Sequence, residues 1–330
     1  MKKLFILAAA IVAFASCSKE PETIVNDGSI KFMSAQTRHQ AGESTIANLK
    51  TDGFTVYGYT ANYDVFAPAK ATDTDNDGTW TTDVTKYWAD NQVYDFVAFY
   101  AQASNSITSS KNDRTVTVNY TLDGVTDFIA AYATTNTNDH NLAKDAVQLN
   151  FGHQLERVAF KFVNKFDVDE RNFSVTVTDV KLNGVPSKAV YKYVNGLDVI
   201  CTPSTDDADK MNLDFEFADG ANVINPNTDG NAEAQTYYCL IIPTTSVATY
   251  NFTCTVVVKD LDNNGEVIKT FNVSQNITPE STVTKYEAGQ SYVFTANVYS
   301  LVNPIEFTVD VAKWGVDTPA GTITIGDEKK

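Results

Sequence analysis

Histidine is scarce in this sequence, and the motifs of common enzyme classes are missing from it. The 330 residues include three histidines, His39, His140 and His153. There is no Gly-x-Ser-x-Gly elbow, no His-Glu-x-x-His zinc motif and no glycine-rich phosphate loop. Because the chain has 41 acidic residues, some carboxylates must lie close together by chance. A carboxylate pair is therefore no evidence for acid–base catalysis. We therefore predict that the protein is not an enzyme and holds no cofactor.

Cysteine is scarce as well, with Cys17, Cys201, Cys239 and Cys254 in the whole chain. This number excludes a small disulfide-stabilised scaffold, so the fold must depend on buried apolar surface. Cys239 and Cys254 lie in neighbouring strand-like runs and could pair if those runs are adjacent. The sequence does not determine that distance, so the disulfide state of the three later cysteines stays open.

Basic residues are fewer than acidic ones, 25 against 41, which gives a formal net charge of −16. Such a balance repels phosphate backbones and anionic lipid headgroups. We therefore predict no nucleic-acid partner. The solubility of a surface protein is a sufficient reason for this charge.

Long apolar runs are absent except at the N-terminus. Residues 4–15 form an apolar run behind two lysines, which is too short for a membrane-spanning helix of ~20 residues and matches the core of a secretory signal peptide. Cys17 follows Ala15 and Ser16, as in a lipobox, where the cysteine is acylated and becomes the new N-terminus. An ordinary signal peptide with a nearby cysteine is the alternative. We predict removal of residues 1–16 and a lipid-anchored tether over residues 17–28.

The rest of the chain shows the alternation of β-strands, and helical periodicity is nearly absent. Ile30 and Phe32 lie on one face of a predicted strand and Lys31 on the other. Residues 94–101 are apolar on both faces, which indicates a buried central strand. Many such short runs, separated by Asn, Asp and Gly turns, predict an all-β fold of antiparallel β-sandwiches.

The length of the chain suits two domains of this kind. The charged segment 167–172 interrupts the apolar rhythm. We therefore predict an N-terminal β-sandwich domain over residues 29–171 and a C-terminal one over residues 172–330.

Two polar features are candidate sites that we interpret as structural. Asp73, Asp75 and Asp77 have the spacing of a calcium loop, but Val84 occupies the position of the required bidentate glutamate. A solvated turn is therefore favoured over a metal site. His153 lies between two predicted strands and is expected to be a hydrogen-bonded structural residue rather than a catalytic base.

Several segments, taken in their order, match the pattern of one known family. They are Cys17, Thr37-Arg38 after the first strand, Tyr87-Trp88, the strand at 95–100, Asp127-Phe-Ile-Ala-Ala-Tyr132, Phe151-Gly-His-Gln-Leu-Glu-Arg-Val158 and Val311-Ala-Lys-Trp-Gly315. The combination resembles the fimbrillin family, the type V pilins of Bacteroidales-type Gram-negative bacteria. The resemblance spans most of the chain. It implies two transthyretin-like β-sandwich domains and a surface-exposed outer-membrane lipoprotein.

The resemblance also implies a route of assembly into a pilus that supports adhesion. A protease specific for Arg or Lys would cut after Arg38 and remove the first strand, residues 29–38. Loss of Ile30 and Phe32 would leave unpaired backbone groups and an apolar groove that another chain's strand can fill. Other pilus subunits are then the expected partners, because head-to-tail contacts that do not close give a filament.

The donor strand is expected near the C-terminus. Ile323 and Ile325, in a possible donor tail over residues 315–330, share one face of a short strand. Residues 307–311 are the other candidate, although they are expected to belong to their own sandwich. Whether the subunit forms the shaft, the tip or the anchor stays open, as does the surface ligand.

The alternative function is a surface-exposed outer-membrane glycan-binding lipoprotein. Trp80, Trp88 or Trp314 would serve as exposed stacking platforms for sugar rings. Core packing is the ordinary explanation of a tryptophan, and we favour it for Trp88 and Trp314.

Overall fold

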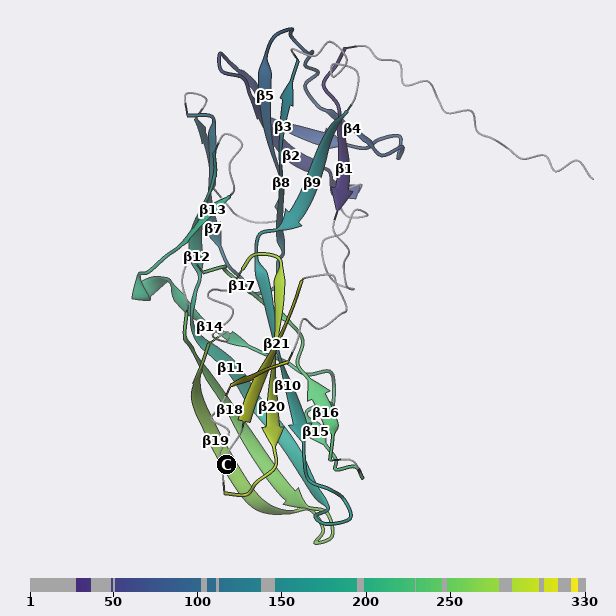
Figure 1. Ribbon diagram of the computed structural model, residues 1–330, viewed down its shortest axis with the longest axis vertical. Helices are drawn as coiled ribbons and strands as arrows, with labels where there is room; N and C mark the ends of the chain where they lie inside the picture. Colours follow the sequence, from purple (N-terminus) through teal and green to yellow (C-terminus); the bar gives the residue numbers. More distant parts are fainter. Residues whose placement is uncertain are drawn as a thin grey trace, which may run out of the picture.

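The structure is a computed structural model that is almost entirely β-strand, which confirms the all-β prediction. It describes residues 28–36, 49, 51–101, 106–110, 113–137, 146–194, 199–228, 230–244, 248–278, 287–302, 306–313 and 322–325. A single turn of 3-10 helix spans Asp207–Asp209. Among the helices that the structure describes, none is long and apolar enough to cross a membrane. Figure 1 shows an elongated molecule with β1 to β5 at one end and β18 and β19 at the other.

Seven strands of the first half close into a barrel. Around the barrel they follow the order β1 (Phe32–Gln36), β4 (Thr79–Thr82), β3 (Asp64–Thr72), β2 (Phe54–Tyr59), β5 (Val93–Ala101), β8 (Phe128–Asn136) and β9 (Val147–His153). β1 pairs antiparallel with β4 and parallel with β9, so it completes the barrel. The interior is apolar and rich in aromatic rings, because successive side chains of each strand point alternately inward and outward.

β5 shows why one strand of the barrel is apolar on both faces. Tyr94, Phe96 and Ala98 belong to the barrel interior. Val97 and Phe99 face outward and belong to a second core. The prediction that residues 94–101 form a central strand, buried on both sides, is thus confirmed.

A four-stranded sheet covers the outer face of the barrel at β2, β5 and β8. Its order is β13 (Ile200–Pro203), β12 (Lys188–Val194), β7 (Thr115–Thr121) and β6 (Ser106–Ser110). Aromatic contacts join the two layers, with ring centroids 4.9 Å apart for Phe99 and Tyr193 and 5.1 Å apart for Phe128 and Tyr191. In Figure 1 this sheet lies beside the barrel and extends toward the second half.

The second half is built from two further sheets that face each other. One has the order β16 (Ala232–Gln235), β10 (Glu156–Asn164), β20 (Gln290–Val298), β21 (Glu306–Lys313) and β22 (Thr322–Ile325), with β17 (Cys239–Ile241) also on β10. The other has the order β14 (Lys210–Asp214), β11 (Phe173–Pro186), β18 (Tyr250–Asp260) and β19 (Glu266–Ile277), with β15 (Val223–Ile224) also on β11. Phe160 and Phe252 meet between them, with ring centroids 4.6 Å apart, as in a β-sandwich.

Strand pairing crosses the predicted domain boundary at residues 171 and 172. β10 precedes that boundary but pairs with β20 and β16 of the second half. β7 also precedes it and pairs with β12. One core of buried residues extends from Tyr57 on β2 to Val298 on β20. The two halves are therefore joined by shared sheets and a shared core.

Candidate functional site

The first strand holds the barrel closed along two edges. The backbone N–H of Ile30 donates to the carbonyl of Lys86 at 2.8 Å, and that of Val147 donates to the carbonyl of Lys31 at 2.8 Å. In register, Phe32 lies opposite Trp80 on β4 and Val147 on β9. We call the space between β4 and β9 that β1 fills the β1 slot.

The side chains of this strand alternate between the barrel interior and the outside. Ile30 is 2% exposed and Phe32 is fully buried, whereas Met33 is 44% exposed. The ring of Phe32 lies within 5.2 Å of Phe96, 6.1 Å of Phe66 and 6.2 Å of Phe54, measured between centroids. Burial of two such side chains contributes roughly 3–6 kcal/mol, and aromatic pairing adds to it. The first strand is therefore part of the core.

β9 has more paired residues with β1 than with any other described strand. β9 pairs with β8 through Gly152 and His153 alone, but with β1 over all of residues 147–151. Without β1, most of β9 and the first half of β4 would have backbone groups without a strand partner. The aromatic residues around Phe32 would then line an open trough. Such a trough between two unpaired strand edges can accept an extended chain.

The predicted donor candidates lie side by side in the C-terminal half. β21, which contains residues 307–311, pairs with β20 along its length. β22 pairs with β21, with Ile323 opposite Val309 and Ile325 opposite Phe307. β22 has no second strand partner among the described residues, and it is the last strand of its sheet. Cys17, Arg38 and Trp314 lie outside the described residues.

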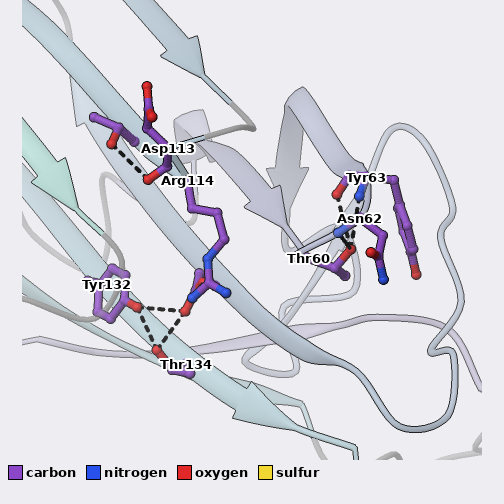
Figure 2. A network of polar contacts seen from close by, with 9 residues as sticks. Thr60, Asn62, Tyr63, Asp113, Arg114, Tyr132 and Thr134 are labelled. Carbon is purple, nitrogen blue, oxygen red and sulfur yellow. Dashed lines mark hydrogen bonds and ion pairs between the residues drawn. The ribbon is translucent and has the colours of Figure 1, made fainter.

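A buried ion pair attaches the hairpin of β6 and β7 to the outside of the barrel (Figure 2). Arg114, in the hairpin turn, places its Nη2 2.5 Å from Oδ2 of Asp95 on β5. Asp95 is 2% exposed, and its Oδ1 accepts hydrogen bonds from Tyr132 at 2.8 Å and Thr134 at 3.0 Å. Burial, with the nearby Asp95 carboxylate, raises the pKa of Tyr132 to about 12. This network joins β5 and β8, which are neighbours in the barrel.

The polar candidates of the sequence have structural roles here. Both carboxylate oxygens of Asp73 accept backbone N–H groups, from Asp77 at 3.1 Å and Gly78 at 3.1 Å, and Asp77 in turn accepts the N–H of Thr79. This is the hydrogen bonding of a tight turn, and the described part of the chain contains no group of three side chains able to hold a metal ion. His153 is buried, with its Nδ1 2.9 Å from Oδ2 of Asp127, and so links the end of β9 to the loop before β8.

The tryptophan positions correct one expectation. Trp80 is 1% exposed and packs on Phe54 inside the barrel, with ring centroids 6.1 Å apart. It therefore cannot stack on a sugar while the barrel is closed, and the interpretation of Trp80 as an exposed platform is wrong. Trp88 is half-buried and meets the ring of Tyr94 edge-on at 4.8 Å, which agrees with core packing.

The three described cysteines are free thiols. Burial raises the pKa of Cys201 and of Cys254 to about 12 and that of Cys239 to about 11. The pairing of Cys239 with Cys254, which the sequence left open, is not formed.

Comparison with known proteins places this geometry in a family. A family model described as fimbrillin-like matches residues 37–314. The chain is similar to a fimbrial protein from Bacteroides vulgatus, with 17% identity over 87% of this chain and 99% of that one, at a TM-score of 0.56. A proposed cell adhesion protein from Bacteroides uniformis matches with 15% identity over 87% of this chain and 100% of that one, at a TM-score of 0.49. No curated protein matches the chain. Because the family model covers most of the sequence, the chain belongs to the fimbrillin-like family.

Proposed function

We propose that this protein is a non-catalytic structural subunit of a cell-surface pilus, which supports adhesion. In this proposal it is exported as an outer-membrane lipoprotein through Cys17, and a protease cuts after Arg38. β1 then leaves its slot, and a strand from a neighbouring subunit takes its place. The observation that carries the proposal is that β1 is an N-terminal strand in the middle of an aromatic core, with Arg38 two residues beyond its end.

The connection to Arg38 gives the strand a route out of the barrel. An internal strand such as β5 cannot be removed by one cut, because the chain continues on both sides of it. β1 is followed by Arg38 and preceded by the tether that would carry the lipid. A single cut therefore separates β1 from the rest of the barrel, and only non-covalent contacts hold it afterwards.

The features of β22 support its role as the donor strand. Ile323 and Ile325 repeat the two-residue spacing of Ile30 and Phe32, so both could point into the trough together. Burial of these two side chains would contribute roughly 3–6 kcal/mol to the binding of the donor strand, before the entropic cost of ordering it is subtracted. Hydrogen bonds to both slot edges and a longer apolar segment would be needed for a durable junction. Among the described strands of one subunit, β22 pairs with β21 alone, so moving β22 disrupts one described strand pair.

Limited digestion of the mature protein with trypsin tests the proposal. We expect N-terminal sequencing to find His39 as the new terminus, and gel electrophoresis after mild denaturation to show ladders of subunits. The matched control is Arg38→Gln, which removes the cleavage point and leaves β1 in place. Ladders that form equally in the control, or a cut product that stays a stable monomer, would contradict donor-strand assembly.

A further inference from the structure

A depression lies on the outer face of the four-stranded sheet, away from the barrel. It has a volume of about 430 Å³ and is bounded by β7, β12, β13 and the loop that follows β13. The inner face of these strands carries the buried Val118, Tyr120 and Tyr191. Side chains at the alternate positions therefore point outward and form the floor of the depression.

The floor has one exposed apolar side chain, with polar neighbours on both sides. Val190 on β12 is 40% exposed. In register it lies between Asn119 on β7 and Thr202 on β13. A ligand on this floor therefore contacts the methyl groups of Val190, with the Asn119 amide on one side and the Thr202 hydroxyl on the other.

One wall of the depression is a fixed and electrically neutral polar cluster. Oδ1 of Asp209 lies 2.6 Å from Nζ of Lys188, and Oδ2 accepts the hydroxyl of Ser204 at 2.8 Å. The hydroxyl of Ser187 donates to the backbone carbonyl of Asp209 at 2.7 Å. The Lys188 ammonium and the Ser204 hydroxyl lower the pKa of the Asp209 carboxyl. Because the ammonium and the carboxylate neutralise each other, the wall offers hydrogen-bond donors and acceptors without favouring a charged ligand.

We propose that this depression binds a neutral saccharide of one or two pyranose rings. A pyranose has an apolar C–H face that can lie on Val190. The hydroxyl groups of a pyranose both donate and accept hydrogen bonds, so they can pair with the Thr202 hydroxyl and the Asp209 carboxylate. The volume falls in the range of small-molecule sites. The site would give the subunit an adhesive contact of its own. Binding there does not depend on cleavage at Arg38, because β1 does not pair with β7, β12 or β13.

Saturation-transfer NMR on the uncut Arg38→Gln protein tests the inference independently of polymerisation. The probes are the methyl glycosides of glucose, galactose, mannose, fucose and N-acetylglucosamine, each at millimolar concentration, and methyl glucuronide as an anionic comparison. We expect saturation transfer to at least one neutral glycoside and a weaker signal from the glucuronide. Absence of transfer to every neutral glycoside, or a stronger signal from the glucuronide, would overturn the proposal.

Two substitutions locate the binding. Val190→Arg fills the floor of the depression and is expected to weaken binding by ~10-fold or more, which corresponds to ~1.4 kcal/mol. The matched control is Val267→Arg on β19, because Val267 is also an exposed strand valine, at 52%. Thr202→Val removes one hydroxyl at nearly constant shape and should weaken binding without affecting folding. Binding that survives both Val190→Arg and Thr202→Val would place the saccharide elsewhere and contradict this site.

Discussion

Replacement of Phe32 by alanine should strongly destabilise the intact subunit. The ring is fully buried and lies within 5.2 to 6.2 Å of Phe96, Phe66 and Phe54, between centroids. Its neighbours belong to a closed barrel and cannot collapse freely into the space. Truncation of such a phenylalanine costs ~3–5 kcal/mol in transfer and cavity terms. We therefore expect Phe32→Ala to lower the free energy of unfolding by that amount in urea titrations followed by tryptophan fluorescence.

The matched control is Met33→Ala on the same strand. Met33 is 44% exposed, so its truncation should change stability by no more than ~0.5 kcal/mol. If Phe32→Ala costs less than ~1 kcal/mol, or no more than Met33→Ala, then β1 does not contribute to the core as argued. In that case the trough left by its removal would provide little energy for a donor strand.

Three further changes probe other buried groups. Glu156 is fully buried, and burial with nearby Glu287 raises its pKa well above the usual value. The folded state thus keeps a proton that the unfolded chain releases between the unfolded and the folded pKa. Over this pH range the free energy of unfolding should fall by up to ~1.4 kcal/mol per pH unit, and Glu156→Gln should abolish the fall in urea midpoints. Arg114→Met leaves the Asp95 carboxylate buried without its cation and should lower the free energy of unfolding by ~3 kcal/mol in urea titrations. Adding Asp95→Asn should recover part of that loss. An unchanged urea midpoint in Arg114→Met would refute the stabilising role of the ion pair. In a variant whose other cysteines are replaced by serine, Cys254, with its pKa raised to about 12 by burial, should react with Ellman's reagent only after denaturation. Fast labelling of this variant in its native state would contradict the burial of Cys254.

In the proposed assembly, a cut after Arg38 would remove the competition between the subunit's own β1 and a donor strand. As long as β1 is covalently attached, its effective concentration near the slot is that of a tethered ligand, in the millimolar range or above. A donor strand from another subunit would have to displace it at a much lower free concentration. A cut after Arg38 would remove this advantage of the attached strand, because β1 could then diffuse away. Assembly would thus be delayed until the subunit reaches the protease.

Local pattern was sufficient to predict which faces of the strands are buried. Ile30 and Phe32 alternate with Lys31, and the barrel buries the first two. The absence of helical periodicity correctly indicated an all-β fold. These features depend on the two-residue period of a strand, which is written in the sequence itself.

Partner strands could not be predicted in the same way. The apolar alternation of β10 does not reveal that it pairs with β20, which is more than 120 residues later in the chain. Nor does the alternation of β1 show that it runs parallel to β9 and closes a barrel. The burial of Trp80 follows from that closure, since its own strand is short and polar around it. Register and partners are set by tertiary packing, which a periodic pattern does not contain.

The ion pair of Arg114 and Asp95 was also missed, although a signal for it exists. Asp95 is the single charged residue in a run that is apolar on both faces. A buried carboxylate needs a cation or hydrogen-bond donors. The strand around Asp95 could therefore have predicted a partner, but not that Arg114 from a hairpin turn would supply it.

Hydrogen–deuterium exchange of β9 tests donor-strand replacement most directly. The amide of Val147 donates to Lys31 in the intact subunit, and residues 147–151 have β1 as their main strand neighbour. The amides of Val147, Leu149 and Phe151 face β1, because alternate N–H groups of a strand point to the same side. We expect slow exchange of these three amides in the uncut protein, fast exchange after cleavage in a variant lacking residues 315–330, and slow exchange again in polymers of the cut full-length subunit. If they exchange as fast in the polymer as in the cut, tail-less subunit, no strand has entered the β1 slot and the account is contradicted.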